Sequence, residues 1–279
     1  ELTEDMMSKL AMMNPDKPEQ VVKFLRSLHE ATTLDMVLEF WINALLSNPM
    51  TQVVNVLSNA LTFGLAIPER GAAALADIAL SVARGTPRTR FIGEIDAAFR
   101  GGVMGITEAN RALLRAVATG LPAEAVSKLE VTRTAAIPGV AGEIIRTPGR
   151  ALIASDEWFK ALNYSSELYT VAYRQAMQEV RAGRLPESEF PARWAELILS
   201  PTDELDEAAR TAMRYRVFQQ QPGAFTRAVM QARTASKVGP FVVPFVRTPV
   251  NIFKYALERS PLAFFYVGAR QFNMVGAGP

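Results

Sequence analysis

The most restrictive feature of this sequence is a recurring pair in which a polar residue is followed directly by proline. A polar side chain caps the free N–H groups at a helix start, and proline fits the first helical turn because that turn needs no N–H donor. Each pair therefore predicts a helix start. The pairs are Asn48-Pro49, Thr147-Pro148, Ser200-Pro201, Thr248-Pro249 and Ser260-Pro261.

Strand signals are nearly absent, because no stretch alternates apolar and polar residues between turn residues. We therefore expect an all-α fold, an irregular assembly of about a dozen helices with proline-marked starts. The predicted ranges are 3–13, 17–30, 34–47, 49–66, 70–84, 107–119, 123–134, 156–182, 188–199, 203–220, 223–237, 249–259 and 261–272. The helix capped by Ser155 is expected to be the longest, and the segment 240–246, which contains Pro240 and Pro244, to be an extended hinge.

The glycines between residues 85 and 105, among them Gly93, Gly101 and Gly102, predict a lobe boundary or a mobile loop. We divide the chain into an N-terminal helical lobe (1–105), a central helical lobe (106–239) and a basic, aromatic C-terminal hinge with helices (240–279). Because residue 1 is Glu, and the last residues form no anchoring signal, the chain is expected to be a segment of a larger protein.

Residues 40–68 contain no charged side chain, a length that suffices to cross a bilayer. Many of these residues are polar, which argues against a span that faces lipid, because an unsatisfied polar group in hydrocarbon is costly. The polar residues recur at helical spacing along one face, opposite an apolar face of Met50, Val53, Val54, Leu57, Ala60 and Leu61. This stripe, a candidate assembly seam, consists of Asn48, Gln52, Asn55, Asn59 and Thr62.

Two interpretations fit the stripe. It belongs to a core helix whose amides meet solvent or a partner helix, or it forms a helix–helix or lumen-lining seam in an oligomer. An exposed helix normally carries Lys or Glu on its wet face, so an uncharged stripe favours a buried seam. We expect Gln52, Asn55 and Asn59 to face protein.

The C-terminal part of the chain is basic and aromatic. Residues 208–279 carry ten Lys/Arg and one acid, Glu258, a net charge of +9, whereas residues 1–207, with 20 Lys/Arg and 27 Asp/Glu, carry −7. Such a composition suits phosphate-bearing surfaces, either anionic lipid or nucleic acid, with rings such as Phe241, Phe245 and Phe264 as anchors. Alternatively, the rings form a core and the cations pair with the acidic part of the chain. The predicted contacts are Arg227, Arg233, Lys237, Arg247, Lys254 and Arg259.

Signals for catalysis are weak. The chain has no cysteine, which excludes disulfides, thiolate nucleophiles and cysteine-ligated zinc, and the sole histidine, His29, sits at a predicted helix end. The acids of Glu187-Ser188-Glu189 and of Asp203-Glu204 with Asp206-Glu207 fall where helices start, a common place for acids. No glycine-rich phosphate loop occurs. We expect no active site and no cofactor in this segment.

Three stretches together resemble the internal virion, or ejection, proteins of short-tailed bacteriophages, including giant polypeptides such as virion RNA polymerases. They are Leu46-Ser47-Asn48-Pro49-Met50 through Asn59, Arg146-Thr147-Pro148-Gly149-Arg150 through Tyr164, and Pro244-Phe245-Val246-Arg247-Thr248-Pro249-Val250-Asn251-Ile252. Their specificity lies in the trio and its order, since none is a catalytic fingerprint.

The resemblance implies a protein of the virion, in the capsid interior or tail, that moves to the bacterial envelope on infection and helps to form or anchor the conduit for the genome. It implies other virion or ejection proteins as partners, a homo-oligomer, portal or tail proteins, and DNA or an anionic membrane surface. Any enzymatic domain of the parent protein would lie elsewhere. The alternative is a non-catalytic docking or DNA-guiding region of a large phage virion enzyme.

Overall fold

The computed structural model describes residues 31–123, 135–236 and 238–260. These residues form ten α-helices, one 3₁₀ turn and no strands, which confirms the all-α class. The elements are α3 (Thr33–Leu46), α4 (Pro49–Arg84), α5 (Glu94–Thr119), α6 (Gly139–Ile145), α7 (Thr147–Arg181), η1 (Glu187–Glu189), α8 (Phe190–Leu199), α9 (Asp203–Arg216), α10 (Ala224–Ala235), α11 (Gly239–Val242) and α12 (Arg247–Glu258).

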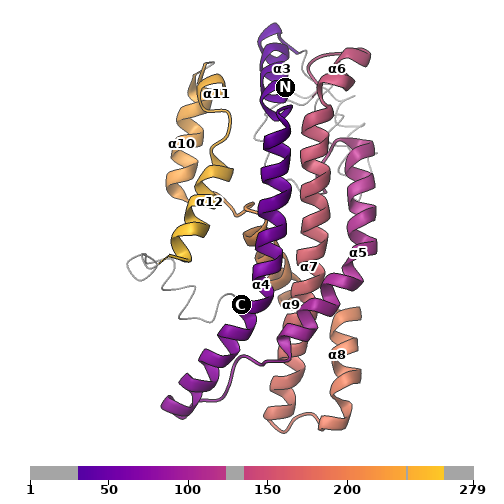
Figure 1. The fold of residues 1–279 in the computed structure, drawn as a ribbon, viewed down its shortest axis with the longest axis vertical. Helices are drawn as coiled ribbons and strands as arrows, with labels where there is room; N and C mark the ends of the chain where they lie inside the picture. Colours follow the sequence, from indigo (N-terminus) through magenta and orange to yellow (C-terminus); the bar gives the residue numbers. More distant parts are fainter. Residues whose placement is uncertain (1–30, 124–134, 237, 261–279) are drawn as a thin grey trace, which may run out of the picture.

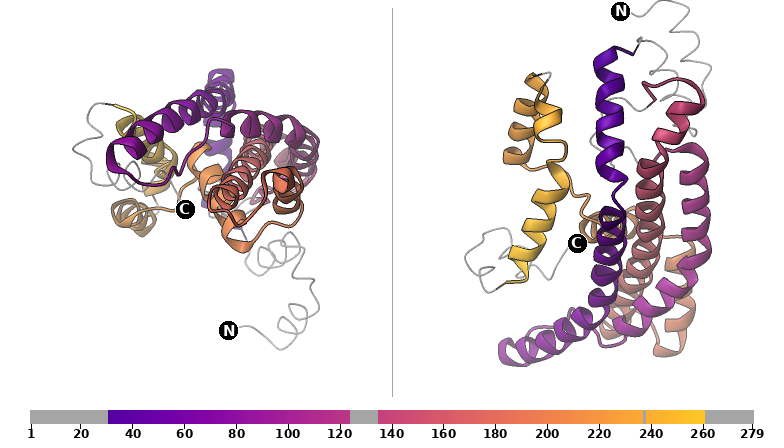
Figure 2. Two further views of the ribbon diagram at one scale, coloured as in Figure 1. Left: turned by 90° about the horizontal axis from the view of Figure 1, so that it is seen from below. Right: turned by 45° about the horizontal axis from the view of Figure 1, so that its top comes forward.

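Helix α7 is the axis of the molecule. Helices α4 and α5 run beside it, α8 and α9 pack near its C-terminal end, and α3 continues the column of α4 (Figure 1). Helices α10, α11 and α12, which we call the arm, lie on the α4 side of this bundle, away from α5 and α8 (Figures 1 and 2). The arm is thus separated from the bundle core but placed next to α3 and α4.

The proline pairs lie at or near helix starts. Asn48 caps α4, with its side chain accepting a hydrogen bond from the Met50 N–H at 3.0 Å and Pro49 in the first turn. Pro148 lies in the first turn of α7, and the pairs at 200 and 248 lie near the starts of α9 and α12. The pair at 260 and the predicted helices 3–13, 17–30, 123–134 and 261–272 lie wholly or partly outside the described residues.

Three local predictions were wrong. Ser155 does not cap a helix, because α7 already begins at Thr147, and α4, with 36 residues, is one residue longer than α7. The helices predicted at 49–66 and 70–84 are one helix that continues through Pro68. Part of the predicted extended hinge, residues 240–242, belongs to the single helical turn α11.

The glycine-rich stretch predicted as a boundary or mobile loop is mostly helical, since only residues 85–93 connect α4 to α5. A Cβ on Gly101 would lie 2.5 Å from the Ser165 carbonyl oxygen, and one on Gly102 would lie 2.9 Å from the Phe63 ring. The glycines therefore let α5 approach α7 and α4 closely. The division expected between residues 105 and 106 falls inside α5.

An apolar core of ordinary type lies where α7, α8 and α9 meet. It includes Leu168, Val171, Leu197 and Leu205, with Trp194 packed against it. A second cluster joins α3, α7 and the segment before α12, because Ile42 and Leu46 of α3 pack with Leu152 of α7 and with Phe245. This second cluster attaches the arm to the bundle.

Candidate functional site

The amide stripe of α4 faces α7, and its centre is the buried carboxylate of Asp156. Asn55 and Asn59 donate to Asp156 Oδ1 at 3.1 and 3.2 Å, and Gln219 donates to Oδ2 at 3.3 Å. Asn55 also donates to the Ser155 hydroxyl at 3.0 Å. Because Asp156 and Asn59 are almost fully buried, these hydrogen bonds replace those that water would otherwise supply.

The remaining members of the stripe also bond within the chain. Gln52 donates to the carbonyl oxygens of Leu46 at 2.9 Å and of Pro148 at 3.2 Å, and Thr62 donates to that of Arg216 at 3.1 Å. Asn48 serves as the exposed N-cap of α4. The structure therefore places the predicted assembly seam between α4 and the α7 and α9 helices of the same chain, where four of its five members are hydrogen-bonded to other parts of the fold.

Sequence reasoning missed the acceptor of this seam. The predicted cap at Ser155 placed Asp156 in the first turn of a helix, but Asp156 lies well inside α7 and is 2% exposed. Nothing in a linear sequence shows which helix lies opposite, so only the uncharged stripe itself signalled a buried polar contact.

Further along α4, a charged cluster continues the polar contact with α7. Glu167 Oε2 accepts from Arg70 of α4 and from Arg216 of α9, each at 2.6 Å. Burial raises the pKa of Glu167, but the neighbouring Arg216 and Arg70 guanidinium groups outweigh burial and hold it well below its usual range. Burial and the neighbouring Arg216 guanidinium, which shares the Glu167 carboxylate, lower the pKa of Arg70 to about 10. Arg70 therefore stays charged at neutral pH.

A similar ion cluster fixes the start of α5. Glu94, 2% exposed, accepts from Arg174 of α7 at 2.8 and 3.2 Å, lies 3.7 Å from Arg90, and accepts the Phe91 N–H at 2.9 Å. At the other end of the bundle, Glu39 of α3 accepts from Arg146. Polar and charged contacts thus hold α3, α4 and the start of α5 on α7.

The side of α4 that points away from α7 is apolar and exposed. Its exposed side chains in the first half of the helix are Met50, Val53, Val54, Leu57, Leu61 and Leu65, each at least half exposed. The exposure continues into α3 with Leu34, Val37, Phe40 and Trp41, and along the second half of α4 with Leu75, Leu80 and Val82. We call these exposed apolar residues of α3 and α4 the outer face.

Helix α4 is long and apolar enough to cross a membrane, and only 17% of its most apolar 18-residue window is buried. The core helix of a soluble protein can pass the same test of length and composition, but it is mostly buried, unlike α4. The sequence-based argument against lipid contact assumed that the polar groups would face lipid. The structure removes this assumption for Gln52, Asn55 and Asn59, which face α7.

The six predicted phosphate contacts do not form one surface. Arg233 is buried and donates to the carbonyl oxygens of Val243 and Pro244 at 2.7 and 2.9 Å, so it holds the arm together. Arg259 donates to both oxygens of Glu69 at 2.8 and 2.9 Å and lies 3.6 Å from the centre of the Tyr255 ring. It therefore attaches the arm to α4, as the alternative of pairing with the acidic part of the chain predicted.

The other four predicted contacts differ in accessibility. Arg227 is exposed, Arg247 and Lys254 are half-buried, and Lys237 lies outside the described residues. Lys254 donates to the side-chain oxygen of Gln220 at 3.3 Å and lies 3.9 Å from Glu258.

Of the predicted aromatic anchors, Phe245 is part of a core cluster, Phe241 is half-buried, and Phe264 lies outside the described residues. The rings that the arm does expose are Phe225 and Phe253. Sequence composition identified the aromatic character of this region without separating the core rings from the surface rings.

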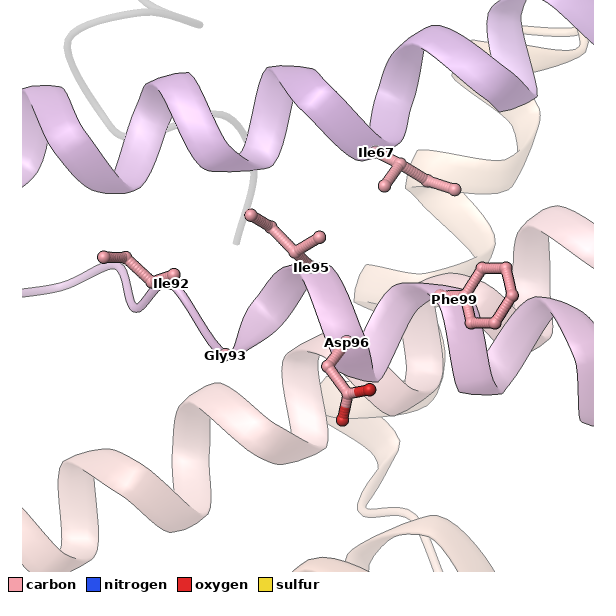
Figure 3. Close-up of a pocket in the computed structure, with 6 residues that line it drawn as sticks. All are labelled: Ile67, Ile92, Gly93, Ile95, Asp96 and Phe99. Carbon is pink, nitrogen blue, oxygen red and sulfur yellow. The ribbon is translucent and has the colours of Figure 1, made fainter.

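An open depression between α4 and the start of α5 is lined by Ile67, Ile92, Gly93, Ile95, Asp96 and Phe99 (Figure 3). Asp96 is the only ionisable residue of this lining, and it pairs with Arg100 at 2.7 Å. Within the described ranges, no group of three His, Asp or Glu residues could hold a metal ion.

The acids that the sequence places at helix starts are either exposed or paired with neighbouring side chains. Glu187 and Glu189 lie exposed in η1, and Asp203, Glu204 and Asp206 lie in the first turn of α9. Asp206 pairs with Arg210 at 2.7 Å and accepts from the Tyr164 hydroxyl at 2.6 Å. Burial and this hydrogen bond raise the pKa of Tyr164 to about 12. His29 lies outside the described residues.

No protein-family model, no curated protein and no solved structure matches this chain.

Proposed function

We propose that this chain is a structural assembly segment of a bacteriophage internal virion protein, one that helps to form or anchor the conduit for genome delivery across the bacterial envelope. The segment itself is proposed to carry no catalytic site. Its partners would be other virion or ejection proteins, including further copies of the chain, with portal or tail proteins and DNA or an anionic membrane surface as further contacts. Its location would be the virion and then the host envelope.

The observation that carries this proposal is the convergence of the three stretches on which the resemblance rests. Leu46 of the first, Leu152 of the second and Phe245 of the third pack in one apolar cluster, although they are about a hundred residues apart in sequence. Gln52 of the first stretch also donates to the Pro148 carbonyl of the second. Contacts between the three stretches thus hold α3, α4, α7 and the arm together, as expected for motifs of an assembly module.

The distribution of polarity also supports assembly. The outer face leaves apolar side chains exposed along two consecutive helices, and exposed apolar patches of this extent mark contacts with a membrane or another protein. The depression between α4 and the start of α5 is lined by apolar residues, Gly93 and a single paired acid.

The test of this proposal is the location of the chain. Quantitative mass spectrometry of purified particles of the virus that encodes it should detect several copies per particle, and the same peptides should appear in host envelopes after infection. Synthesis of the chain in infected cells without its presence in particles would overturn the proposal.

One observation favours the alternative, a docking or DNA-guiding region of a large phage virion enzyme. No Asp or Glu occurs between Glu207 and Glu258, and the arm formed from this segment carries the exposed Arg227 and the half-buried Lys254. Such an acid-free surface suits a nucleic-acid backbone. A single copy per particle, cross-linked to a polymerase domain, would favour this alternative over the assembly segment.

A further inference from the structure

We propose that the outer face of α3 and α4 rests against the acyl chains of an anionic bilayer, with α3 and α4 lying along the membrane surface. This inference deepens the proposed function, on which it rests only for the identity of the membrane as part of a bacterial envelope. The polar residues of the segment 40–68 argued against lipid contact, whereas this inference assigns lipid contact to the apolar residues of the outer face.

The first reason is the absence of charge from the central part of the outer face, within residues 40–68. Residues 40–68 contain no ionisable side chain, and the polar ones among them that belong to the stripe are directed to α7 or cap the helix. The exposed positions Leu57, Leu61 and Leu65 recur every four residues along α4, and Leu57 lies on the helix face opposite Asn55 and Asn59. A surface that meets water over such a length normally carries Lys or Glu.

The second reason is the way in which the helices beneath the outer face are joined. Helix α5 packs on α7 through Gly101, Gly105 and Ala109, at four-residue spacing, and α4 packs on α7 through amide hydrogen bonds. Small residues and polar side chains are the joining groups typical of helices in membranes, because lipid competes equally for large apolar side chains. On α4, large apolar side chains such as Leu57 and Leu61 are accordingly left on the outer face.

The third reason is charge complementarity, which favours a lipid surface over a second protein. The arm lies on the α4 side of the bundle (Figures 1 and 2), and its chain is free of acids up to Glu258, whose carboxylate accepts from Tyr215. The exposed Arg227 and the half-buried Lys254 are accompanied by the exposed rings of Phe225 and Phe253. Cations near an apolar face, with aromatic rings beside them, match anionic headgroups above acyl chains.

The geometry favours a helix pair lying along the membrane over one that crosses it. Helix α4 has 36 residues, about 54 Å at 1.5 Å per residue, whereas the hydrocarbon core is about 30 Å thick. Helix α5 carries the exposed ion pairs Asp96–Arg100 and Glu108–Arg111. Such pairs belong in water, so the exposed side of α5 faces solvent while the outer face meets lipid.

The absence of cysteine permits a direct test with single labels on the full chain. A Leu57→Cys variant and a Leu199→Cys variant would each carry an environment-sensitive NBD dye; Leu199 is 83% exposed at the end of α8 and serves as the matched control. Addition of vesicles of phosphatidylcholine and phosphatidylglycerol should shift the emission of the Leu57 label to the blue and leave the Leu199 label unchanged. Vesicles of phosphatidylcholine alone should give a smaller shift.

A second measurement compares matched charge substitutions. The double variant Leu57→Glu with Leu61→Glu should lower the vesicle partition coefficient at least about tenfold, because two apolar side chains lose their lipid contact. The control, Leu114→Glu with Leu199→Glu, changes two leucines that are exposed elsewhere and should leave the partition coefficient unchanged.

Two results would overturn the inference. In the first, the Leu57 label does not respond to anionic vesicles. In the second, its emission shifts with protein concentration in the absence of vesicles, which would identify a second copy of the chain as the cover of the outer face. A chain found in virus particles that ignores vesicles would defeat this inference alone, whereas a chain that binds vesicles but is absent from particles would defeat only the proposed function.

Discussion

The two halves of α7 are covered in opposite ways. Around its C-terminal half, α8 and α9 bury Leu197 and Leu205 and turn ionic side chains such as Arg193 and Glu196 outward. Around its N-terminal half, α4 buries Asn59 and Thr62 against α7 and α9 and turns Leu57 and Leu61 outward. In the first arrangement, apolar side chains are buried and charged side chains are exposed, as is usual for a protein surface in water. In the second arrangement, polar side chains are buried and apolar side chains are exposed.

This difference shows that composition alone does not decide what a helix faces. Both regions are folded around the same helix, but the contact of α4 with α7 is made by hydrogen bonds and ion pairs, and apolar residues such as Leu57 and Leu61 stay exposed. The α8 and α9 region is complete as it stands, whereas the α3 and α4 region exposes an apolar surface. The following experiments test whether the two regions differ in this way.

The largest effect is expected from loss of the buried carboxylate that joins α4, α7 and α9. Glu167→Gln would leave Arg70 and Arg216 without their shared anion in a buried site, and we expect the free energy of unfolding to fall by about 3–5 kcal/mol. The matched control is Glu196→Gln, which removes an exposed partner of Arg193 and should cost less than about 1 kcal/mol. Equal urea denaturation curves for the two variants would show that the polar contact does not hold α4.

The pH dependence of stability gives a second test of the same site. The pKa of Glu167 is lower in the folded chain than its ordinary value of 4.5, so its contribution to stability is complete above pH 4.5 and is lost as the pH falls below that value. The stability difference between the wild type and Glu167→Gln should therefore shrink on acidification, by at most about 1.4 kcal/mol per pH unit. A difference that stays constant between pH 6 and pH 3, followed by urea denaturation, would contradict an ion pair at this site.

A smaller effect is expected where α5 approaches α7. Gly101→Ala would place a Cβ 2.5 Å from the Ser165 carbonyl oxygen and 2.9 Å from the Ser166 Cα, and should cost about 1–3 kcal/mol. Gly64→Ala is the control, since its Cβ would meet nothing within 4 Å and alanine favours the helix by about 0.5–1 kcal/mol. The two variants should shift the thermal midpoint in opposite directions. A stabilising Gly101→Ala would show that α5 and α7 are less closely packed.

The helices were predictable where local chemistry determines them. The Asn48-Pro49 pair predicted the start of α4, because a cap and a proline act within one turn. Pro68 and the glycines of α5 misled for the opposite reason, since their effect depends on neighbours that the sequence does not show. Pro68 is exposed within α4, which continues through it, whereas Gly101 is required by a helix about sixty residues away.

The candidate site was predictable only in part. The spacing of Gln52, Asn55 and Asn59 identified a polar face correctly, because a helix repeats every 3.6 residues whatever lies beside it. The partner of this face is Asp156 of the same chain. This pairing depends on how the helices pack, which the sequence does not show. The spacing also identified the opposite apolar face, but the exposure of that face followed from the same packing and was not predicted, since the polar residues were taken as evidence against lipid contact.

The smallest effect on folding is expected from the outer face itself. In Leu57→Gln with Leu61→Gln, two exposed side chains, each 55% accessible, are replaced by polar ones of similar helix propensity, and the free energy of unfolding in buffer should change by less than about 0.5 kcal/mol. By contrast, Leu197→Ala in the α8 region, at 2% exposure, should cost about 2–5 kcal/mol. Urea denaturation without lipid measures both. Because the reversed polarity of α4 leaves these leucines without a role in the isolated chain, a loss above about 1 kcal/mol in the double variant would mean that the outer face is already covered by the chain's own residues.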